Sequence, residues 1–247
     1  MKDCAKSVNQ RVAIQSLDFW ICFYETITQR ISNLKQYEHI FTQFKEVSLL
    51  LLLASQKLPN IQYDALEPEE ISELELQERG VDVVTFRGHV EDIILKTYFL
   101  LMKHYGTEGG NLVFQMLLNL LQEGTQDIFK AEVALFGARS LLDGFDEDDI
   151  DEITLAFFGK LIEYFLTNPT AKDSFIVAKS VILFIDQAAK MLQQFSQSAP
   201  GIVAYLFDIY TRHPKLQAKS LETLLEYAIY NKAIFTLDLV KAIHTFF

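Results

Sequence analysis

Apolar side chains recur along most of this chain with the spacing of amphipathic α-helices. In the first segment, residues three or four positions apart form one broad apolar stripe, because such residues share a helix face. That stripe consists of Val12, Leu17, Trp20, Phe23, Tyr24 and Ile27. The same pattern predicts about ten helical segments. Their approximate bounds are residues 7–30, 37–56, 85–105, 111–122, 126–142, 149–168, 173–195, 200–213, 215–230 and 236–247.

Residues that favour helix ends separate these segments. The glycines within Gly106–Gly110 predict the turn between the third and fourth segments. Asp173 is a predicted N-cap, and Pro200 is a predicted first-turn proline. The stretch at 60–80 is rich in Glu and contains Pro68, which predicts mostly loop with room for one short helix. Few other breaks occur, because the chain has only 5 Pro and 10 Gly.

The helix starts are periodic. The third, fifth, seventh and ninth segments begin near residues 85, 127, 173 and 215, a period of roughly 40 to 47 residues that matches HEAT and armadillo repeats. We therefore predict an α-solenoid of about five HEAT-type helical hairpins. The prediction is one array over residues 1–247. Its repeats are approximately residues 7–57, 81–123, 125–168, 171–213 and 214–247, with an acidic insertion at 60–80.

The seventh segment is apolar on more than half of its circumference. The residues that cover it are Val177, Val181, Ile182, Phe184, Ile185, Ala188 and Leu192. A helix in a solenoid packs against its own partner and against both adjacent repeats, and so needs this pattern. A globular helical bundle also buries its helices, but it gives no reason for a period of this length.

The net charge is −11 and the isoelectric point is near 4.9. A protein that binds nucleic acid needs a positive surface to displace counterions from phosphate, so we expect no nucleic-acid partner. Negative charge can attract basic proteins, or it can simply keep a protein soluble.

The cysteine count and the apolar runs bear on the compartment. Cys4 and Cys22 are the only cysteines, too few for a disulfide framework or a usual zinc site, so we predict a reducing compartment. The longest apolar run, Leu49–Ala54, falls far short of the ~20 residues that span a bilayer. No apolar stretch of a signal peptide follows the first residues. These observations predict a soluble intracellular chain with no membrane partner.

Three stretches of the chain resemble, in the same order, segments of the importin-β family. Ser16–Trp20 opens a helix with a Phe-Trp pair. After the acidic insertion come Phe86–Arg87 and Val90–Lys96. The third stretch is Lys130–Phe136, followed by Ala138–Ser140. They are similar to the "FW" helix, the "FR..V.D..K" segment and the "EAALF..RS" helix in the middle of the transportin-SR/importin-13 group of β-karyopherins.

The resemblance implies a middle segment of a nuclear transport receptor with about twenty HEAT hairpins. In that family, N-terminal repeats bind Ran-GTP, the concave face binds cargo, and the convex face binds FG-nucleoporins. The implied partners are therefore a protein cargo, and Ran-GTP and FG-nucleoporins through the full-length receptor. The implied location is the cytoplasm and the nucleus. Import and export both stay open, as does whether the chain is a fragment. The alternative is a HEAT-repeat scaffold subunit of a complex unrelated to transport.

No group of residues predicts catalysis, a cofactor or a metal. The five histidines lie in separate segments, and none belongs to a metal-binding spacing that repeats. His89 and Asp92 stand one helical turn apart, which favours a surface pair over a pair of ligands. Nucleophile elbows, P-loops and dinucleotide fingerprints are absent from the sequence. We expect a protein that is not an enzyme.

Two acidic clusters are the candidate binding sites. The first contains Glu67, Glu69, Glu70 and Glu73, and the second contains Asp146, Glu147, Asp148 and Asp149. Clustered carboxylates can attract a basic import signal or a basic cargo surface. The first cluster reads equally well as a solvated linker. In the second, acidic residues from Asp148 to Glu152 also suit the N-terminus of a helix, where they cap free N–H groups.

The aromatic residues allow one further hypothesis. The chain contains 20 Phe, which could line pockets for FG repeats between outer helices, although phenylalanines packed between helices would give the same composition. Trp20 is the only tryptophan. It lies in the apolar stripe of its helix, so we predict that it belongs to the core.

Overall fold

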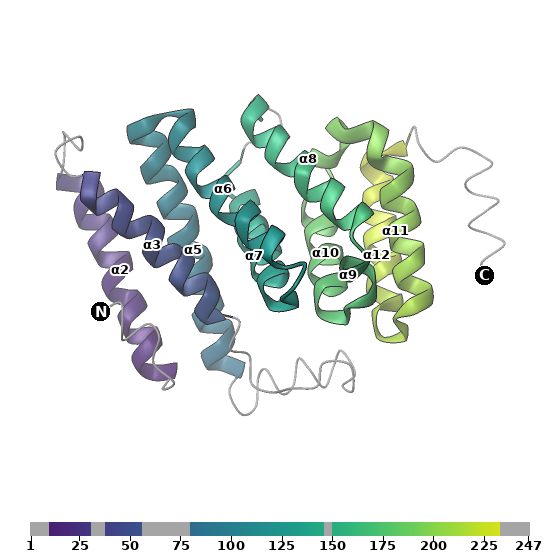
Figure 1. Cartoon of the computed structure of the whole chain (residues 1–247), viewed down its shortest axis with the longest axis horizontal. Coiled ribbons are helices and arrows are strands. Elements are labelled where there is room, and N and C mark those ends of the chain that lie inside the picture. The colour runs from purple at the N-terminus through teal and green to yellow at the C-terminus, as the bar shows by residue number, and fades with distance from the viewer. Residues whose placement is uncertain (1–9, 31–37, 56–79, 146–149, 233–247) are drawn as a thin grey trace. The chain divides into compact units, whose positions relative to one another are not determined.

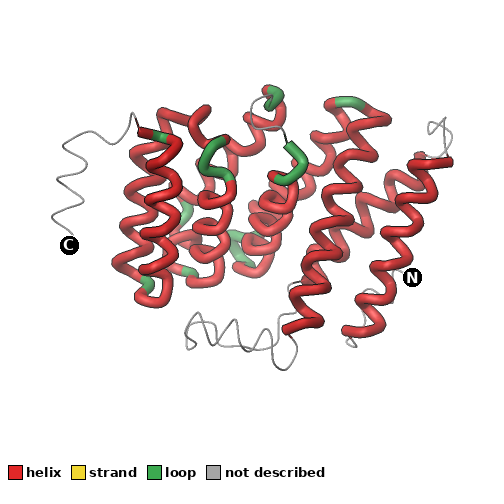
Figure 2. Tube along the Cα trace, turned by 180° about the vertical axis from the view of Figure 1, so that it is seen from behind, coloured by secondary structure: helices red, strands yellow, loops and turns green. Residues whose placement is uncertain are grey.

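The computed structural model describes residues 10–30, 38–55, 80–145 and 150–232, which are almost entirely helical (Figure 1). No strand occurs in these ranges (Figure 2). The prediction of an all-α fold is therefore confirmed for the part of the chain that the structure describes. The chain divides into two compact units, Met1–Gly144 (unit 1) and Phe145–Phe247 (unit 2).

Unit 1 is organised around one long helix. Its helices in the described ranges are α2 (Gln10–Arg30), α3 (Glu38–Ser55), α5 (Gly80–Tyr105), α6 (Thr107–Glu123) and α7 (Ile128–Leu142). The central helix α5 packs against each of the other four. All five helices begin within a few residues of a predicted segment, because the periodic apolar stripe and the breaks at its ends are local features of the sequence.

Aromatic rings fill the space between α2 and α3. Trp20 is buried, and its ring meets that of Phe44 edge to face at a centroid distance of 6.0 Å. Phe44 also stacks on Phe23 with centroids 5.7 Å apart. The prediction that Trp20 belongs to the core is confirmed.

The predicted turn at Gly106–Gly110 is shorter in the structure. Only Gly106 lies outside a helix, with φ +61°, a left-handed conformation that favours glycine. Gly109 and Gly110 are buried inside α6. A Cβ atom on Gly109 would lie 2.1 Å from the carbonyl oxygen of Leu101 in α5. Gly109 therefore permits close helix packing, and the expectation that it marks a turn was wrong.

Unit 2 alternates longer helices with short ones. Its elements are α8 (Glu152–Thr167), α9 (Pro169–Asp173), α10 (Phe175–Gln187), η3 (Met191–Ser198), α11 (Ala199–Arg212), η4 (Pro214–Leu216) and α12 (Gln217–Tyr230). Helix α10 packs against α9 and α12, and α11 packs against α9, η3 and α12. Pro200 lies in the first turn of α11, as predicted.

The predicted helix over residues 173–195 is divided into several parts. Asp173 ends α9 and does not cap α10. The N-cap is Ser174, whose hydroxyl accepts from the backbone N–H of Val177. Helix α10 ends at Gln187, and a 3₁₀ helix begins at Met191. The periodicity did not reveal this second break, because the side chain that stabilises it comes from a residue just after α12. The amide of Asn231 donates to the carbonyl of Ala189, beyond the end of α10.

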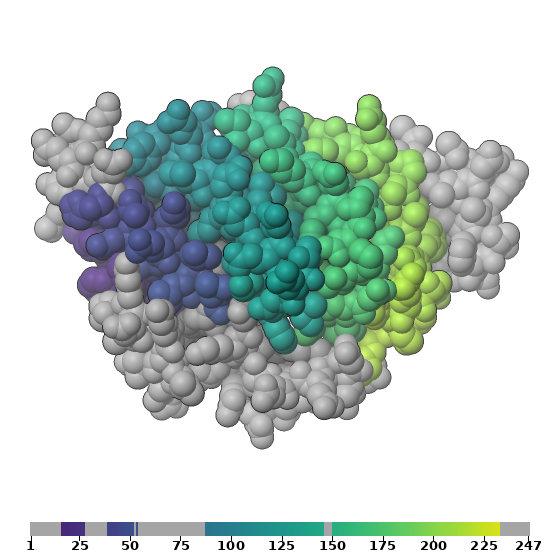
Figure 3. All heavy atoms as spheres, viewed as in Figure 1, coloured from purple at the N-terminus to yellow at the C-terminus, as the bar shows by residue number. Residues whose placement is uncertain are grey.

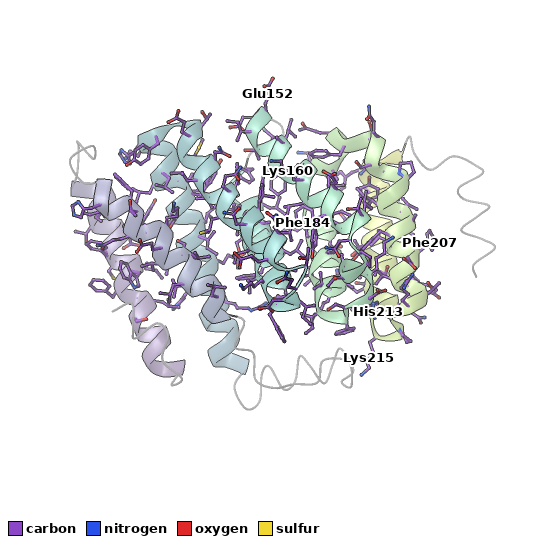
Figure 4. The ribbon with its side chains drawn as sticks, in the orientation of Figure 1. Glu152, Lys160, Phe184, Phe207, His213 and Lys215 are labelled. Carbon is purple, nitrogen blue, oxygen red and sulfur yellow. The ribbon has the colours of Figure 1, made fainter. Side chains whose placement is uncertain are left out.

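The core of unit 2 is also aromatic. Phe158 stacks on Phe184 with ring centroids 5.8 Å apart, and Phe165 meets Tyr205 at 5.3 Å. Figure 4 labels Phe184, which lies inside the unit. On the face drawn in Figure 3, side chains fill the spaces between the helices of the unit. The hydroxyl of Tyr205 donates to the carbonyl of Ala171 at 2.6 Å, so this buried polar atom is satisfied.

Candidate functional site

The two predicted acidic clusters lie outside the described residues. This applies to Glu67, Glu69, Glu70 and Glu73 and equally to Asp146, Glu147, Asp148 and Asp149. Asp151 follows the second cluster and is described. Its carboxylate accepts from the backbone N–H of Thr154 at 2.7 Å and caps α8. The capping interpretation is therefore correct for Asp151, and binding by either cluster stays a prediction.

A buried ion pair joins two of the stretches on which the family resemblance is based. Arg87 of α5 donates two hydrogen bonds to Glu132 of α7, at 2.9 and 2.8 Å. The side chain of Glu132 is only 5% exposed. The guanidinium of Arg87 also lies over the ring of Phe136, 4.8 Å from its centroid. Sequence reasoning missed this pair, because Arg87 and Glu132 are 45 residues apart.

Further charges surround the same ring. Arg139 lies on Phe136 at 5.6 Å. Burial lowers the pKa of Arg139, although the neighbouring carboxylate of Glu91 opposes this shift. Burial likewise raises the pKa of Glu91, and Arg139 opposes that shift. The cluster therefore holds α5 and α7 together by paired charges and ring contacts.

His89 and Asp92 do not pair with each other. His89 Nδ1 lies 3.9 Å from a carboxylate oxygen of Asp18 on α2. Asp92 instead accepts from Lys96 of its own helix at 2.8 Å. The prediction of one surface pair was wrong in its partners, because α2 brings a second carboxylate to His89.

Several side-chain hydrogen bonds link positions that lie one predicted repeat apart. A ring nitrogen of His213 lies 2.6 Å from the carbonyl of Lys172, 41 residues earlier. The amide of Asn231 donates to Ala189, 42 residues earlier. In each case the later residue directly follows a helix, α11 or α12, and bonds to a backbone carbonyl of the preceding part of unit 2.

Among the described residues of unit 2, polar and charged side chains line a pocket of about 260 Å³. Its lining residues are Thr167, Asn168, Pro169, Lys172, Asp173 and Arg212. They come from the end of α8, from α9 with its preceding cap, and from the last residue of α11. His213, labelled in Figure 4, follows α11 at this end of the unit.

Charges of both signs surround this pocket. Arg212 donates to Asp208 at 2.6 Å and to Asp173 at 2.8 Å. The hydrogen bond to Asp208 raises the pKa of Arg212. Lys172 lies 3.7 Å from the other carboxylate oxygen of Asp208. The pocket therefore combines two cations with two carboxylates.

Helix α12 carries the two most exposed large apolar side chains of the described residues. Leu225 is 66% exposed and Ile229 is 49% exposed, and they stand one turn apart. Elsewhere Phe19, Phe99 and Phe129 are each more than two-fifths exposed. Single exposed apolar residues are common on protein surfaces, and within the described ranges the two most exposed, Leu225 and Ile229, stand one turn apart on α12.

Neither a metal centre nor a membrane span is found in the described part of the chain. No three or more His, Cys, Asp or Glu side chains gather there in a way that would hold a metal ion. Within the same ranges, no helix is long and apolar enough to cross a bilayer. Comparisons with protein-family models, with curated proteins and with solved structures find no match to this chain.

Proposed function

We propose that this chain is a protein-binding array of HEAT-type hairpins, and that it forms a middle segment of a nuclear transport receptor of the importin-β family. Its action is binding without covalent chemistry. Stacked hairpins wrap a protein cargo, and Ran-GTP bound elsewhere on the receptor changes the affinity for that cargo. A receptor of this kind shuttles between the cytoplasm and the nucleus and contacts FG-nucleoporins.

The observation that carries the repeat architecture is the separation of bonded residues. Arg87 and Glu132 are 45 residues apart, His213 and Lys172 are 41 apart, and Asn231 and Ala189 are 42 apart. HEAT and armadillo units are about 40 to 47 residues long. Equivalent positions of neighbouring repeats lie side by side in a solenoid, so the Arg87–Glu132 and Asn231–Ala189 contacts, which join neighbouring predicted repeats, support the proposal.

The helix contacts within each unit also support a repeat architecture. In unit 1, α5 packs against the next helix α6 and also against the one after it, α7. In unit 2, α10 packs against α12, and α11 lies between them in the chain and packs against α12. A stack of hairpins places a helix against its counterpart in the next repeat, as α5 meets α7 and α10 meets α12.

The transport part of the proposal rests on the three stretches that resemble β-karyopherins. Arg87 belongs to the second stretch and Glu132 to the third, and the two residues form a bidentate pair. This contact supports reading the two stretches as adjoining parts of one array. It gives them a packing role and leaves the choice of cargo open.

The test is a pull-down from cell extract with the longest natural chain that contains this segment, carried out with and without excess Ran held in its GTP state. Proteins released by Ran-GTP would support an import receptor, and proteins recruited by it would support an exporter. A control with Ran-GDP separates this effect from nonspecific competition. Partners indifferent to both forms of Ran would contradict the transport proposal and favour a HEAT scaffold of another complex.

A further inference from the structure

Helix α12, the last helix that the structure describes, is apolar on more than one side (Figure 1). One side buries Leu224 and Tyr227 where α12 packs against α10 and α11. Another side carries a second apolar row, in which Leu225 is 66% exposed and Ile229 is 49% exposed. We call this row the α12 ridge, and it consists of Ala218, Leu221, Leu225, Ala228 and Ile229. The outer side of a helix at the end of a repeat array is normally polar, so the α12 ridge has the composition of a packing surface.

The residues that follow α12 carry a matching apolar row. On a helix over 236–247, the tenth segment predicted from the sequence, the residues that share one side are Leu239, Val240, Ile243, Phe246 and Phe247. Asp238, Lys241 and Thr245 fall on the other side. This segment lies outside the described residues. A helix of this length is marginal in water by itself, so it needs a surface on which its apolar side is buried.

The lengths of chain fit a return of this segment onto α12. Five residues, 231–235, separate the end of α12 from residue 236, and connections of about two to eight residues are usual between neighbouring helices. Asn231 fixes where the connection begins, because its side-chain amide donates to the carbonyls of Ala189 and Tyr227. Residues 236–247 and residues 218–229 are each twelve residues long. A returning helix of about 18 Å therefore covers the α12 ridge from end to end.

We propose that residues 236–247 form a helix that lies antiparallel on α12, with Leu239, Ile243 and Phe247 packed on the α12 ridge. The proposal rests on the hairpin array proposed above, and it assigns this exposed apolar surface to a segment of the same chain. A second copy of the chain is the main competing occupant, because one apolar surface can pair with its own copy. The adjoining segment has the advantage, since a short connection holds it beside the ridge at high effective concentration.

The test is hydrogen exchange of the full chain, measured by mass spectrometry on peptides that cover residues 236–247. A helix held on α12 exchanges its backbone N–H groups slowly, because they open only when the segment leaves the ridge. We expect exchange at least about tenfold slower than in a free peptide of the same sequence. Exchange as fast as in that peptide would overturn the proposal.

Variants on both sides of the contact locate it. The double variant Leu225→Gln with Ile229→Gln changes side chains that are exposed in the described fold, so the core of unit 2 stays intact. Ile243→Gln places a polar group in the middle of the facing row. Each should abolish the slow exchange of residues 236–247, because a polar side chain at the contact removes the apolar burial that holds the helix there.

Two matched controls should leave the slow exchange unchanged. Leu112→Gln alters a leucine of α6 that is 43% exposed, and Lys241→Gln alters the polar side of the segment. Slow exchange of residues 236–247 that survives Leu225→Gln with Ile229→Gln would overturn the proposal.

Sedimentation over a range of protein concentrations separates the two occupants. Slow exchange of residues 236–247 in a monomer supports packing within one chain. Slow exchange that is lost on dilution, together with dissociation of a dimer, would place a second copy on the α12 ridge and overturn the proposal. These measurements involve neither Ran nor cargo, so their failure is distinguishable from failure of the transport proposal.

Discussion

At the scale of single residues, the bidentate pair between Arg87 and Glu132 is the contact most sensitive to change. Both carboxylate oxygens of Glu132 accept from Arg87, and the carboxylate is shielded from water. A buried ion pair contributes little compared with an apolar replacement of both partners, but removal of one partner takes away the opposite charge that offsets the burial of the other.

Replacing Glu132 by Gln should therefore lower the free energy of unfolding by about 2–4 kcal/mol. Urea unfolding followed by circular dichroism measures this loss. The double replacement Arg87→Met with Glu132→Leu should restore much of it, because both charges of the pair are then removed together. Lys130→Gln, which breaks the more exposed pair with Glu123, is the control and should change stability little. Equal losses in E132Q and K130Q would contradict this account.

Two glycines of unit 1 make a matched pair. Gly109 faces the backbone of α5 so closely that an added Cβ would clash with Leu101, whereas a Cβ on Gly88 meets nothing within 4 Å. Gly109→Ala should destabilise by about 2 kcal/mol or more through overpacking. Gly88→Ala should stabilise by about 0.5–1 kcal/mol, because alanine is the better helix former. Thermal melts of both variants test the contrast, and a Gly109→Ala variant as stable as the parent would refute the close approach.

His104 predicts a pH dependence. Its ring stacks on Phe41, and burial, together with Lys103, lowers its pKa. Because the unfolded state then binds the proton more readily, the folded state loses stability as pH falls through the ordinary range of histidine near 6.5. When the pH is lowered from about 7.5 to about 5.5, one unit either side of that range, the urea midpoint of the parent should fall. The midpoint of His104→Gln should fall by less. An identical fall in both would contradict this assignment.

At the scale of elements, side-chain caps mark where three helices of unit 2 begin. Asp151, Asn168 and Ser174 each offer a side-chain oxygen to a backbone N–H at the start of α8, α9 and α10. These residues satisfy donors that a helix leaves open at its N-terminus. Helix α9 is short because a second cap, Ser174, follows its own cap, Asn168, after only six residues and starts α10.

Removal of the α8 cap tests this element. Asp151→Ala should cost about 1 kcal/mol, because the N–H of Thr154 loses its acceptor at 2.7 Å. Asp151→Asn keeps an oxygen at the same place and should cost only a few tenths of that. The free energy of unfolding in urea reports both values. A larger cost for Asn than for Ala would show that charge at Asp151 matters and that the hydrogen bond does not.

At the scale of the whole molecule, each unit has a core of its own. Unit 1 is built around α5, and unit 2 around the rings of Phe158, Phe184 and Tyr205. In repeat arrays, stability is approximately a sum of local terms and contacts between neighbours. Local damage should therefore stay local.

Hydrogen exchange measured by mass spectrometry checks this expectation. Gly109→Ala should speed exchange in peptides from α5 and α6, which the substitution forces apart. Peptides from α10 and α12 should keep the protection of the parent chain, since they belong to the other unit. A uniform rise over the described helices would instead indicate one cooperative body.

The sequence by itself determined the class of fold and the positions of most helices. Apolar periodicity and helix-breaking residues are local signals, and they located α2, α3, α5, α8 and α12 to within a few residues. The burial of Trp20 also followed from its place in an apolar stripe. These features need no knowledge of distant contacts.

The tertiary structure alone decided which polar residues meet. The pairs Arg87–Glu132 and Asn231–Ala189 join positions more than 40 residues apart, and no local pattern encodes such a match. Gly109 looked like a turn residue because glycine serves both in turns and at close helix contacts. The sequence did not predict the polar pocket either, because one of its lining residues is far along the chain from the others. Asn168 and Lys172 come together with Arg212 only when α9 packs against α11, and long-range packing of this kind is fixed by the fold as a whole.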